Sequence, residues 1–139
     1  MKQILKDDRR IVLRFDLGEE VAESLKKFLA EEQIFTSVFS AIGACSLAEL
    51  AYFNLETKKY ENQIFEEDLE LVSLTGNSSM LNGEVALHSH AVFSRSNFST
   101  LGGHVVRFVV SATCEMFLIK LDGKMQRKLD DKSNLNLLT

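Results

Sequence analysis

The sequence predicts a single α+β domain made mainly of antiparallel strands, with one amphipathic helix near the N-terminus. Three observations predict it. The chain has 139 residues, the length of one ordinary domain. Only residues 16–32 have the apolar spacing of a helix, whereas most of the chain after residue 36 consists of short apolar runs between turn signals. We therefore expect one domain over residues 1–139, with a loosely ordered tail from about residue 130.

The predicted helix has both a start signal and an apolar face. Asp16 is the predicted N-cap, and Glu19, three residues on, completes a capping-box pattern. The helix is predicted to end near Glu32. Its apolar residues fall at i, i+4, i+7 and i+8, one face of a helix, which we interpret as core packing. This face consists of Val21, Leu25, Phe28 and Leu29.

The other segments are predicted strands, because they are rich in β-branched and aromatic residues. Asn82-Gly83 is the strongest hairpin signal in the chain, and Asp122-Gly123 predicts a second hairpin between the last two strands. Gly43 is predicted to end a strand. The predicted strands cover residues 11–15, 36–42, 48–54, 60–65, 69–75, 84–93, 104–121 and 125–129.

Long apolar strands predict an oligomer. Residues 105–110 show little polar alternation, which is typical of a strand buried on both faces. A single helix covers only part of such a sheet. We therefore expect another subunit to cover the remaining apolar surface.

Composition indicates a globular protein of the cytoplasm. Hydrophobic residues make up 45% of the chain and charged residues 26%, a globular profile. No apolar run approaches the roughly 20 residues that span a bilayer, and the charged N-terminus lacks the apolar region of a signal peptide. Cys45 and Cys114 are then expected to be reduced and buried. A position of Cys114 near a metal is the alternative.

The charge balance weighs against nonspecific binding of nucleic acid. The formal net charge is −4, whereas binding to a phosphate backbone depends on Lys and Arg. Basic residues do recur in the last third of the chain, and they form either a solvated face or a polyanion-binding patch. They are Arg95, Arg107, Lys120, Lys124, Arg127, Lys128 and Lys132.

All three histidines of the chain lie within residues 88–104. Because residues two apart on a strand point to the same face, His88 and His90 are predicted to project side by side, with Cα atoms about 6.5 Å apart. His104 opens the next predicted strand, and an antiparallel pairing would bring it to the other two. Gly102-Gly103, just before it, lets the backbone approach a ligand closely.

Three imidazoles and a vacant position are the arrangement of a catalytic type of zinc site. Imidazole also binds copper, iron and nickel. Zinc would lower the pKa of a bound water toward about 7, giving a hydroxide that attacks carbonyl or phosphoryl centres. Glu84, Glu115 and Ser89 are candidates to assist, and the sequence places none of them at the site. The alternative is three ordinary histidines, one in the core and two on the surface.

Several segments of this sequence resemble one known family. They are GEVALHSHAV at residues 83–92, LGGHV at 101–105, FSAIGA at 39–44 and LELVSLTGN at 69–77. Together they resemble the PPC (plant and prokaryote conserved) domain over residues 12–121. The resemblance implies an antiparallel sheet with one main helix, a homotrimer, and a metal, zinc, on His88, His90 and His104.

Stand-alone members of this family are labelled candidate DNA-binding proteins, by analogy with plant proteins in which an AT-hook contacts DNA. This chain has no Arg-Gly-Arg-Pro core of an AT-hook and no Pro at all. Neither this feature nor the net charge supports DNA as a partner.

Three functions therefore stand open. The first is a trimeric zinc-binding module that acts through assembly or by sensing a small-molecule ligand. The second is a metal-dependent enzyme that uses metal-bound water on the three histidines; its catalytic residues are unknown. A cupin would place Glu where Phe93 or Ser94 stands, so that pattern fails here. The third is a DNA-binding regulator. The sequence leaves open whether the site lies within one subunit or between two.

Overall fold

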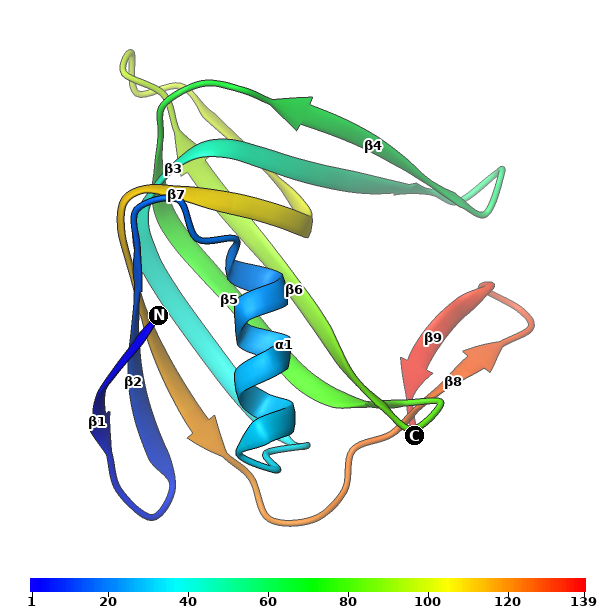
Figure 1. Cartoon of the computed structure of the whole chain (residues 1–139). Coiled ribbons are helices and arrows are strands. Elements are labelled where there is room, and N and C mark those ends of the chain that lie inside the picture. Colours follow the sequence, from blue (N-terminus) through cyan, green and yellow to red (C-terminus); the bar gives the residue numbers. More distant parts are fainter.

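The computed structural model describes all 139 residues as nine strands and one helix (Figure 1). The helix α1 covers Val21–Glu31. The strands are β1 (Lys2–Lys6), β2 (Arg10–Asp16), β3 (Ser37–Asn54), β4 (Lys59–Phe65), β5 (Leu69–Leu81), β6 (Glu84–Ser94), β7 (Thr100–Lys120), β8 (Arg127–Asp130) and β9 (Leu135–Leu138). The predicted α+β class, mostly antiparallel with one helix, is confirmed.

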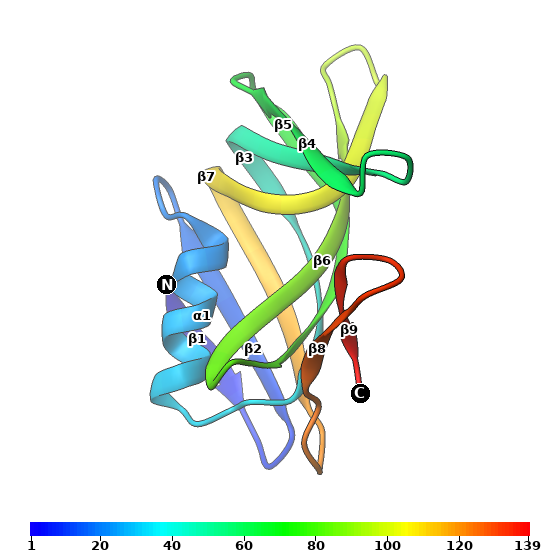
Figure 2. The ribbon, with the colours of Figure 1, turned by 90° about the vertical axis from the view of Figure 1, so that its right-hand side faces the viewer.

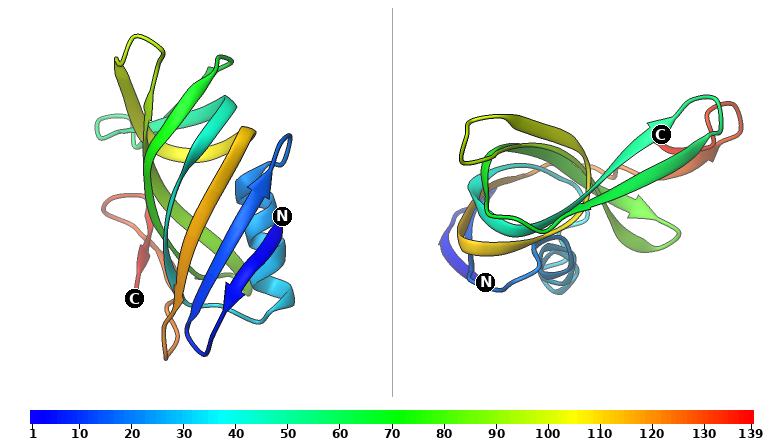
Figure 3. Two further views of the ribbon diagram at one scale, coloured as in Figure 1. Left: turned by 90° about the vertical axis from the view of Figure 1, so that its left-hand side faces the viewer. Right: turned by 90° about the horizontal axis from the view of Figure 1, so that it is seen from above.

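Seven strands form one antiparallel sheet that closes on itself. Their order is β1-β2-β7-β6-β5-β3-β4, and β7 also pairs with β3. The strands β7, β6, β5 and β3 therefore make a closed ring, seen from above in the right-hand view of Figure 3. Closure removes the free edges of these four strands, and β1-β2 and β4 extend the sheet outside the ring.

β3 continues past Gly43, the residue that was expected to end it. Its register with both neighbours shifts at Gly43, so the strand bends there without stopping. The absence of a side chain is required, because a Cβ on Gly43 would lie 2.2 Å from the carbonyl oxygen of Thr113. The glycine therefore marks a bulge and a close backbone approach at the barrel wall.

The turn at Asn82-Gly83 is confirmed. It joins β5 to β6 and has φ values of 53° and 87°, the left-handed pair that a tight hairpin requires. Its position sets the register of β6, in which Asn77 lies opposite His88 and Thr75 opposite His90.

The helix begins later than the sequence predicts. Glu20, not Asp16, is the N-cap, and its carboxylate accepts hydrogen bonds from the backbone N–H groups of Ala22 and Glu23. Glu19 does accept a hydrogen bond from the N–H of Asp16, but this contact closes a turn at Gly18, whose φ is +83°. The predicted apolar face is confirmed, since all four of its residues are buried. This helix is neither long nor apolar enough to cross a membrane.

The core lies between α1 and the inner face of the barrel. α1 packs on β6 and β7, and Figure 2 shows it on one side of β6 with the β8–β9 hairpin on the other. Phe15, Phe93 and Phe108 are fully buried there. Within residues 105–110, Val105 is buried and its neighbour Val106 is exposed in the single chain, so burial of the second face would require the other subunit that the sequence predicts.

The chain after β7 differs most from the sequence prediction. Asp122-Gly123 does not join a hairpin, because both edges of β7 near its end are already paired with β2 and β3. The segment crosses instead to β5, where the N–H of Met80 donates to the carbonyl of Met125. β8 then pairs with β9 in a separate two-stranded sheet. β9 lies in the segment after residue 130, which was expected to be loosely ordered. β1 is a further strand that was not expected.

A Gly43→Ala substitution should lower the free energy of unfolding by about 3 kcal/mol, because the added methyl group overlaps backbone atoms that cannot move aside independently. Urea denaturation measures this change. Ser40→Ala, at an exposed position of the same strand, is the control and should be nearly neutral. Equal stability of the two variants would contradict the close approach at Gly43.

Candidate metal centre

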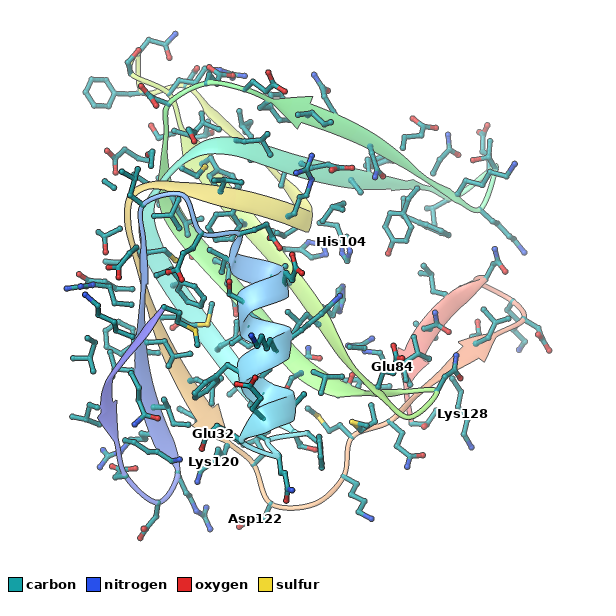
Figure 4. The ribbon with its side chains drawn as sticks, in the orientation of Figure 1. Glu32, Glu84, His104, Lys120, Asp122 and Lys128 are labelled. Carbon is teal, nitrogen blue, oxygen red and sulfur yellow. The ribbon has the colours of Figure 1, made fainter.

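The three histidines converge at one end of the barrel. His88 and His90 point to the same face of β6, as predicted, with ring centroids 5.3 Å apart. β7 pairs antiparallel with β6 so that His104 lies directly opposite His90. The ring of His104 is 5.3 Å from that of His88 and 5.5 Å from that of His90. Figure 4 shows His104 on the N-terminal part of β7, beyond the end of α1.

The spacing of the nitrogens fits a single ion. One ring nitrogen of each histidine lies within 4.8 Å of the corresponding nitrogens of the other two. An ion with metal–nitrogen bonds of about 2.0–2.1 Å holds its ligand nitrogens somewhat closer than this limit, so small rotations of the imidazole rings would bring all three onto one ion. The three residues rest on paired strands, so backbone hydrogen bonds hold their positions.

One buried ring nitrogen of the cluster has no hydrogen-bond partner. Nδ1 of His104 is buried and makes no hydrogen bond with the protein. A buried polar atom without a partner costs about 1–3 kcal/mol, and coordination of a metal or contact with a ligand would remove that cost. The donor set and this unpartnered atom both fit a metal that binds imidazole.

Burial and neighbouring charge favour the neutral form of two of the imidazoles, His88 and His104. Burial, followed by the charges of His88, His90 and Arg127, lowers the pKa of His104 from 6.5 to about 4. The pKa of His88 is lowered by burial and then by Arg127 and His90. A neutral imidazole has a free lone pair, so these two residues can bind a metal at neutral pH without first losing a proton.

A cavity of about 400 Å³ opens beside the cluster, between the barrel and the β8–β9 hairpin. Tyr60 of β4 stacks on His104 with ring centroids 5.0 Å apart. No acidic residue lines this cavity. Its lining consists of Tyr60, Leu81, Ala86, Leu87, His88, His104, Arg127, Asn134, Leu135, Asn136 and Leu137.

The proton-transfer candidates lie elsewhere. Glu84 is exposed at the β5–β6 turn, and Glu115 is exposed on the outer face of β7. Ser89 is buried and lines a second cavity of about 220 Å³, mostly apolar, between α1 and the barrel. His104 borders both cavities. The structure therefore brings the three histidines together and places none of these candidates in the cavity beside the β8–β9 hairpin.

The glycines before His104 have a structural purpose. A Cβ on Gly102 would lie 2.7 Å from the carbonyl oxygen of Ala91, and one on Gly103 would lie 3.1 Å from that of Ala51. These close approaches are made to the backbones of β6 and β3. They let β7 fit between these two strands and so set the position of His104.

Both cysteines are buried and free, as expected. Burial raises the pKa of each thiol to about 12, so neither is a thiolate at neutral pH. Cys114 is not part of the histidine cluster.

Arg127, Tyr60 and Asn77 are residues of this region that the sequence analysis misses. Arg127 appears there only as one of seven scattered basic residues. Since β8 was predicted to pair with β7, no signal brought Arg127 near the histidines.

The metal-free protein should lose stability as the pH falls from 7 to 5. Unfolded His104 takes up a proton near pH 6.5, whereas the folded residue does so only near pH 4. Neutral His104 therefore makes its full contribution to the free energy of unfolding above pH 6.5, and this contribution is lost as the pH falls toward 4. At pH 5 the loss is about 1–2 kcal/mol.

Urea denaturation at the two pH values, in the presence of a chelator, measures this loss. His104→Gln has no proton to take up at this position, so its stability should change less than that of the wild type over the same range. The same pH dependence in both proteins would show that His104 is not the cause.

Comparisons with known proteins place the chain among relatives of the same fold. The model of the Plants and Prokaryotes Conserved (PCC) domain matches residues 3–122. A comparison with curated protein sequences found no match.

Three solved structures are similar along almost their whole length. A metal-containing protein from Archaeoglobus fulgidus is 31% identical, with a TM-score of 0.90 over 100% of this chain and 99% of that chain. A plant- and prokaryote-conserved (PPC) protein from Pyrococcus horikoshii is 32% identical, with a TM-score of 0.89 over 100% and 97%. A candidate DNA-binding protein from Bacteroides thetaiotaomicron is 28% identical, with a TM-score of 0.93 over 97% and 94%. The chain belongs to the Plants and Prokaryotes Conserved domain family, the PPC domain that its sequence resembles.

Proposed function

We propose that this chain is a metal-binding module that holds one divalent metal ion, zinc, on His88, His90 and His104. One observation carries the proposal: three imidazoles from two paired strands place a nitrogen each within 4.8 Å of the others. The relative from Archaeoglobus fulgidus, 31% identical, is described as a metal-containing protein.

The residues of the chain perform three tasks at such a site. β6 and β7 fix the three imidazoles, the low pKa values of His88 and His104 keep those two rings neutral, and the ring of Tyr60 covers one side of His104. Three nitrogens with no thiolate or fourth protein ligand are typical of an open zinc site and not of a closed structural one. When bound, the ion would supply a Lewis acid next to the cavity that His88 and His104 line.

We also propose that the module is a homotrimer. The outer face of β3 and β7 carries exposed apolar side chains, Val38 and Ile42 on β3 and Phe117 and Ile119 on β7, and Val38 lies directly opposite Ile119. Phe117 is 51% exposed and Ile42, one strand over, is 54% exposed. A contiguous apolar face of this kind favours contact with another subunit.

An enzyme is the second candidate function, because the cavity of about 400 Å³ gives a small molecule access to His88 and His104. A metal-dependent reaction would also need a group that transfers protons. Tyr60 is the one residue of the cavity lining, apart from the histidines and Arg127, with a titratable side chain.

DNA binding is the weaker proposal. It comes from the relative described as a candidate DNA-binding protein. The net charge of −4 means that a DNA-binding surface would have to concentrate the basic residues on one face. Affinity for duplex DNA that falls steeply with salt concentration would favour this function over the metal module.

Elemental mass spectrometry of protein purified without a His-tag tests the metal site. Wild type should contain about one metal ion per chain, and His88→Ala, His90→Ala and His104→Ala should each contain little, since each removes one of three ligands. Gln63→Ala, on the exposed strand β4, should retain the metal. No metal in wild type, and no uptake on titration with zinc, would overturn the proposal.

Sedimentation equilibrium tests the trimer. Wild type should have three times the chain mass, and Phe117→Lys should dissociate because it places a charge in the apolar contact. Ser96→Lys, in the exposed β6–β7 loop, should leave the assembly intact. A monomeric wild type would refute the assembly.

A further inference from the structure

Arg127 stands apart from every other arginine of the chain. The five others, Arg9, Arg10, Arg14, Arg95 and Arg107, each form a salt bridge with a carboxylate. Arg127 contacts neutral groups alone: Nε donates to Oγ of Ser79, Nη1 to the carbonyl of Asn136, and Nη2 to Oδ1 of Asn77. These bonds hold the guanidinium in place without neutralising its charge.

The guanidinium retains capacity for a further partner. Arginine has five N–H donors, and three of them are used in these bonds. The side chain is partly buried, which lowers its pKa and raises the free-energy cost of leaving the charge unpaired. An anion that accepts the remaining N–H groups would compensate that charge.

Arg127 is anchored next to the histidines. Its partner Asn77 lies on β5 directly opposite His88 on β6. Arg127, His88 and His104 all line the same cavity of about 400 Å³. Its positive charge acts on both histidines, since it helps to lower their pKa values.

The cavity is positive in character and small. It contains no acidic residue, and its lining adds Tyr60 and the amides Asn134 and Asn136. The β3–β4 and β8–β9 hairpins meet at its outer side, where Nζ of Lys58 donates to the carbonyl of Lys132 and the amide of Asn134 donates to the carbonyl of Lys58. A volume of this size admits a small organic molecule.

We propose that this cavity binds a small molecule bearing an oxyanion, a carboxylate or a phosphate, which Arg127 holds beside the histidine cluster. The planar guanidinium matches both groups, because each offers paired oxygens to its N–H groups. The inference rests on the proposed metal site, since a metal on the three histidines adds a second positive centre to the same cavity. It goes further by naming the chemistry of the ligand and the residue that recognises it.

Titration calorimetry with acetate and with inorganic phosphate, on zinc-loaded protein, tests the proposal. The cobalt-loaded protein gives a second readout, since an anion that reaches the metal changes its visible absorption. Wild type should bind at least one probe, and Arg127→Gln should weaken that binding about tenfold or more. Binding of acetate alone assigns a carboxylate ligand, and binding of phosphate alone assigns a phosphate.

Two variants keep the result interpretable. Lys128→Gln removes the same charge at the next residue of β8, outside the cavity, and should bind the probe as wild type does. Arg127→Lys keeps the charge, so it should retain more affinity than Arg127→Gln even if the hairpin loosens. Binding by wild type that is equal in Arg127→Gln, or no binding of either probe at tens of millimolar, would overturn the proposal.

Metal content separates this inference from the proposed function. Arg127→Gln should still contain about one metal ion per chain, because the three histidines are unchanged. If wild type takes up no metal, the proposed function fails, and the same titrations on metal-free protein then decide whether Arg127 alone binds the anion. If wild type contains metal but neither probe binds, the anion site fails and the metal module stands.

Discussion

The structure depends on the pairing of β7 with three other strands. This 21-residue strand pairs with β6 through its first residues, with β2 through its last ones, and with β3 along most of its length. The β3–β7 pairing converts a seven-stranded sheet into a closed barrel. Two glycines lie where the backbones of β3 and β7 come closest: a Cβ on Gly43 would lie 2.2 Å from the carbonyl oxygen of Thr113, and one on Gly103 would lie 3.1 Å from that of Ala51.

The position of the histidine cluster is a consequence of that closure. His104 lies at the position where β7 is paired on both sides, with Ala51 of β3 on one side and His90 of β6 on the other. The imidazoles are therefore held by backbone hydrogen bonds on three strands and not by a loop. Sites built on regular strands hold their ligands more rigidly than sites built on loops. Gly102 and Gly103, which allow β7 to approach β6 and β3 closely, directly precede His104 in that strand.

Patterns local in the sequence were predictable, and long-range pairings were not. The His88–His90 spacing has the two-residue period of a strand, and Asn82-Gly83 identifies its own turn, so these features could be predicted. The position of His104 beside His88 and His90 could be predicted too, because it requires only that two consecutive strands pair antiparallel. The path after β7 could not be predicted in this way, because β7 pairs with β2, whose residues lie about 100 positions earlier in the chain.

Arg127 is the clearest example of this limit. Nothing in its immediate sequence differs from that of the other basic residues nearby. Its environment is created by Asn77 and Ser79 of β5, about 50 residues earlier in the chain. At the helix start, a correct local contact is overridden by a tertiary one. Asp16 and Glu19 form the expected local hydrogen bond. The N–H of Gly18, however, donates to the carbonyl of Val110 on β7, and the helix begins only at Val21.

The two parts of the cavity wall also differ in when the ribosome makes them. The strands that carry the three histidines, β6 and β7, both end by Lys120, whereas the β8–β9 hairpin begins at Arg127. The hairpin that carries Arg127 is therefore the last part of the cavity wall to be synthesised, after both strands that carry the histidines.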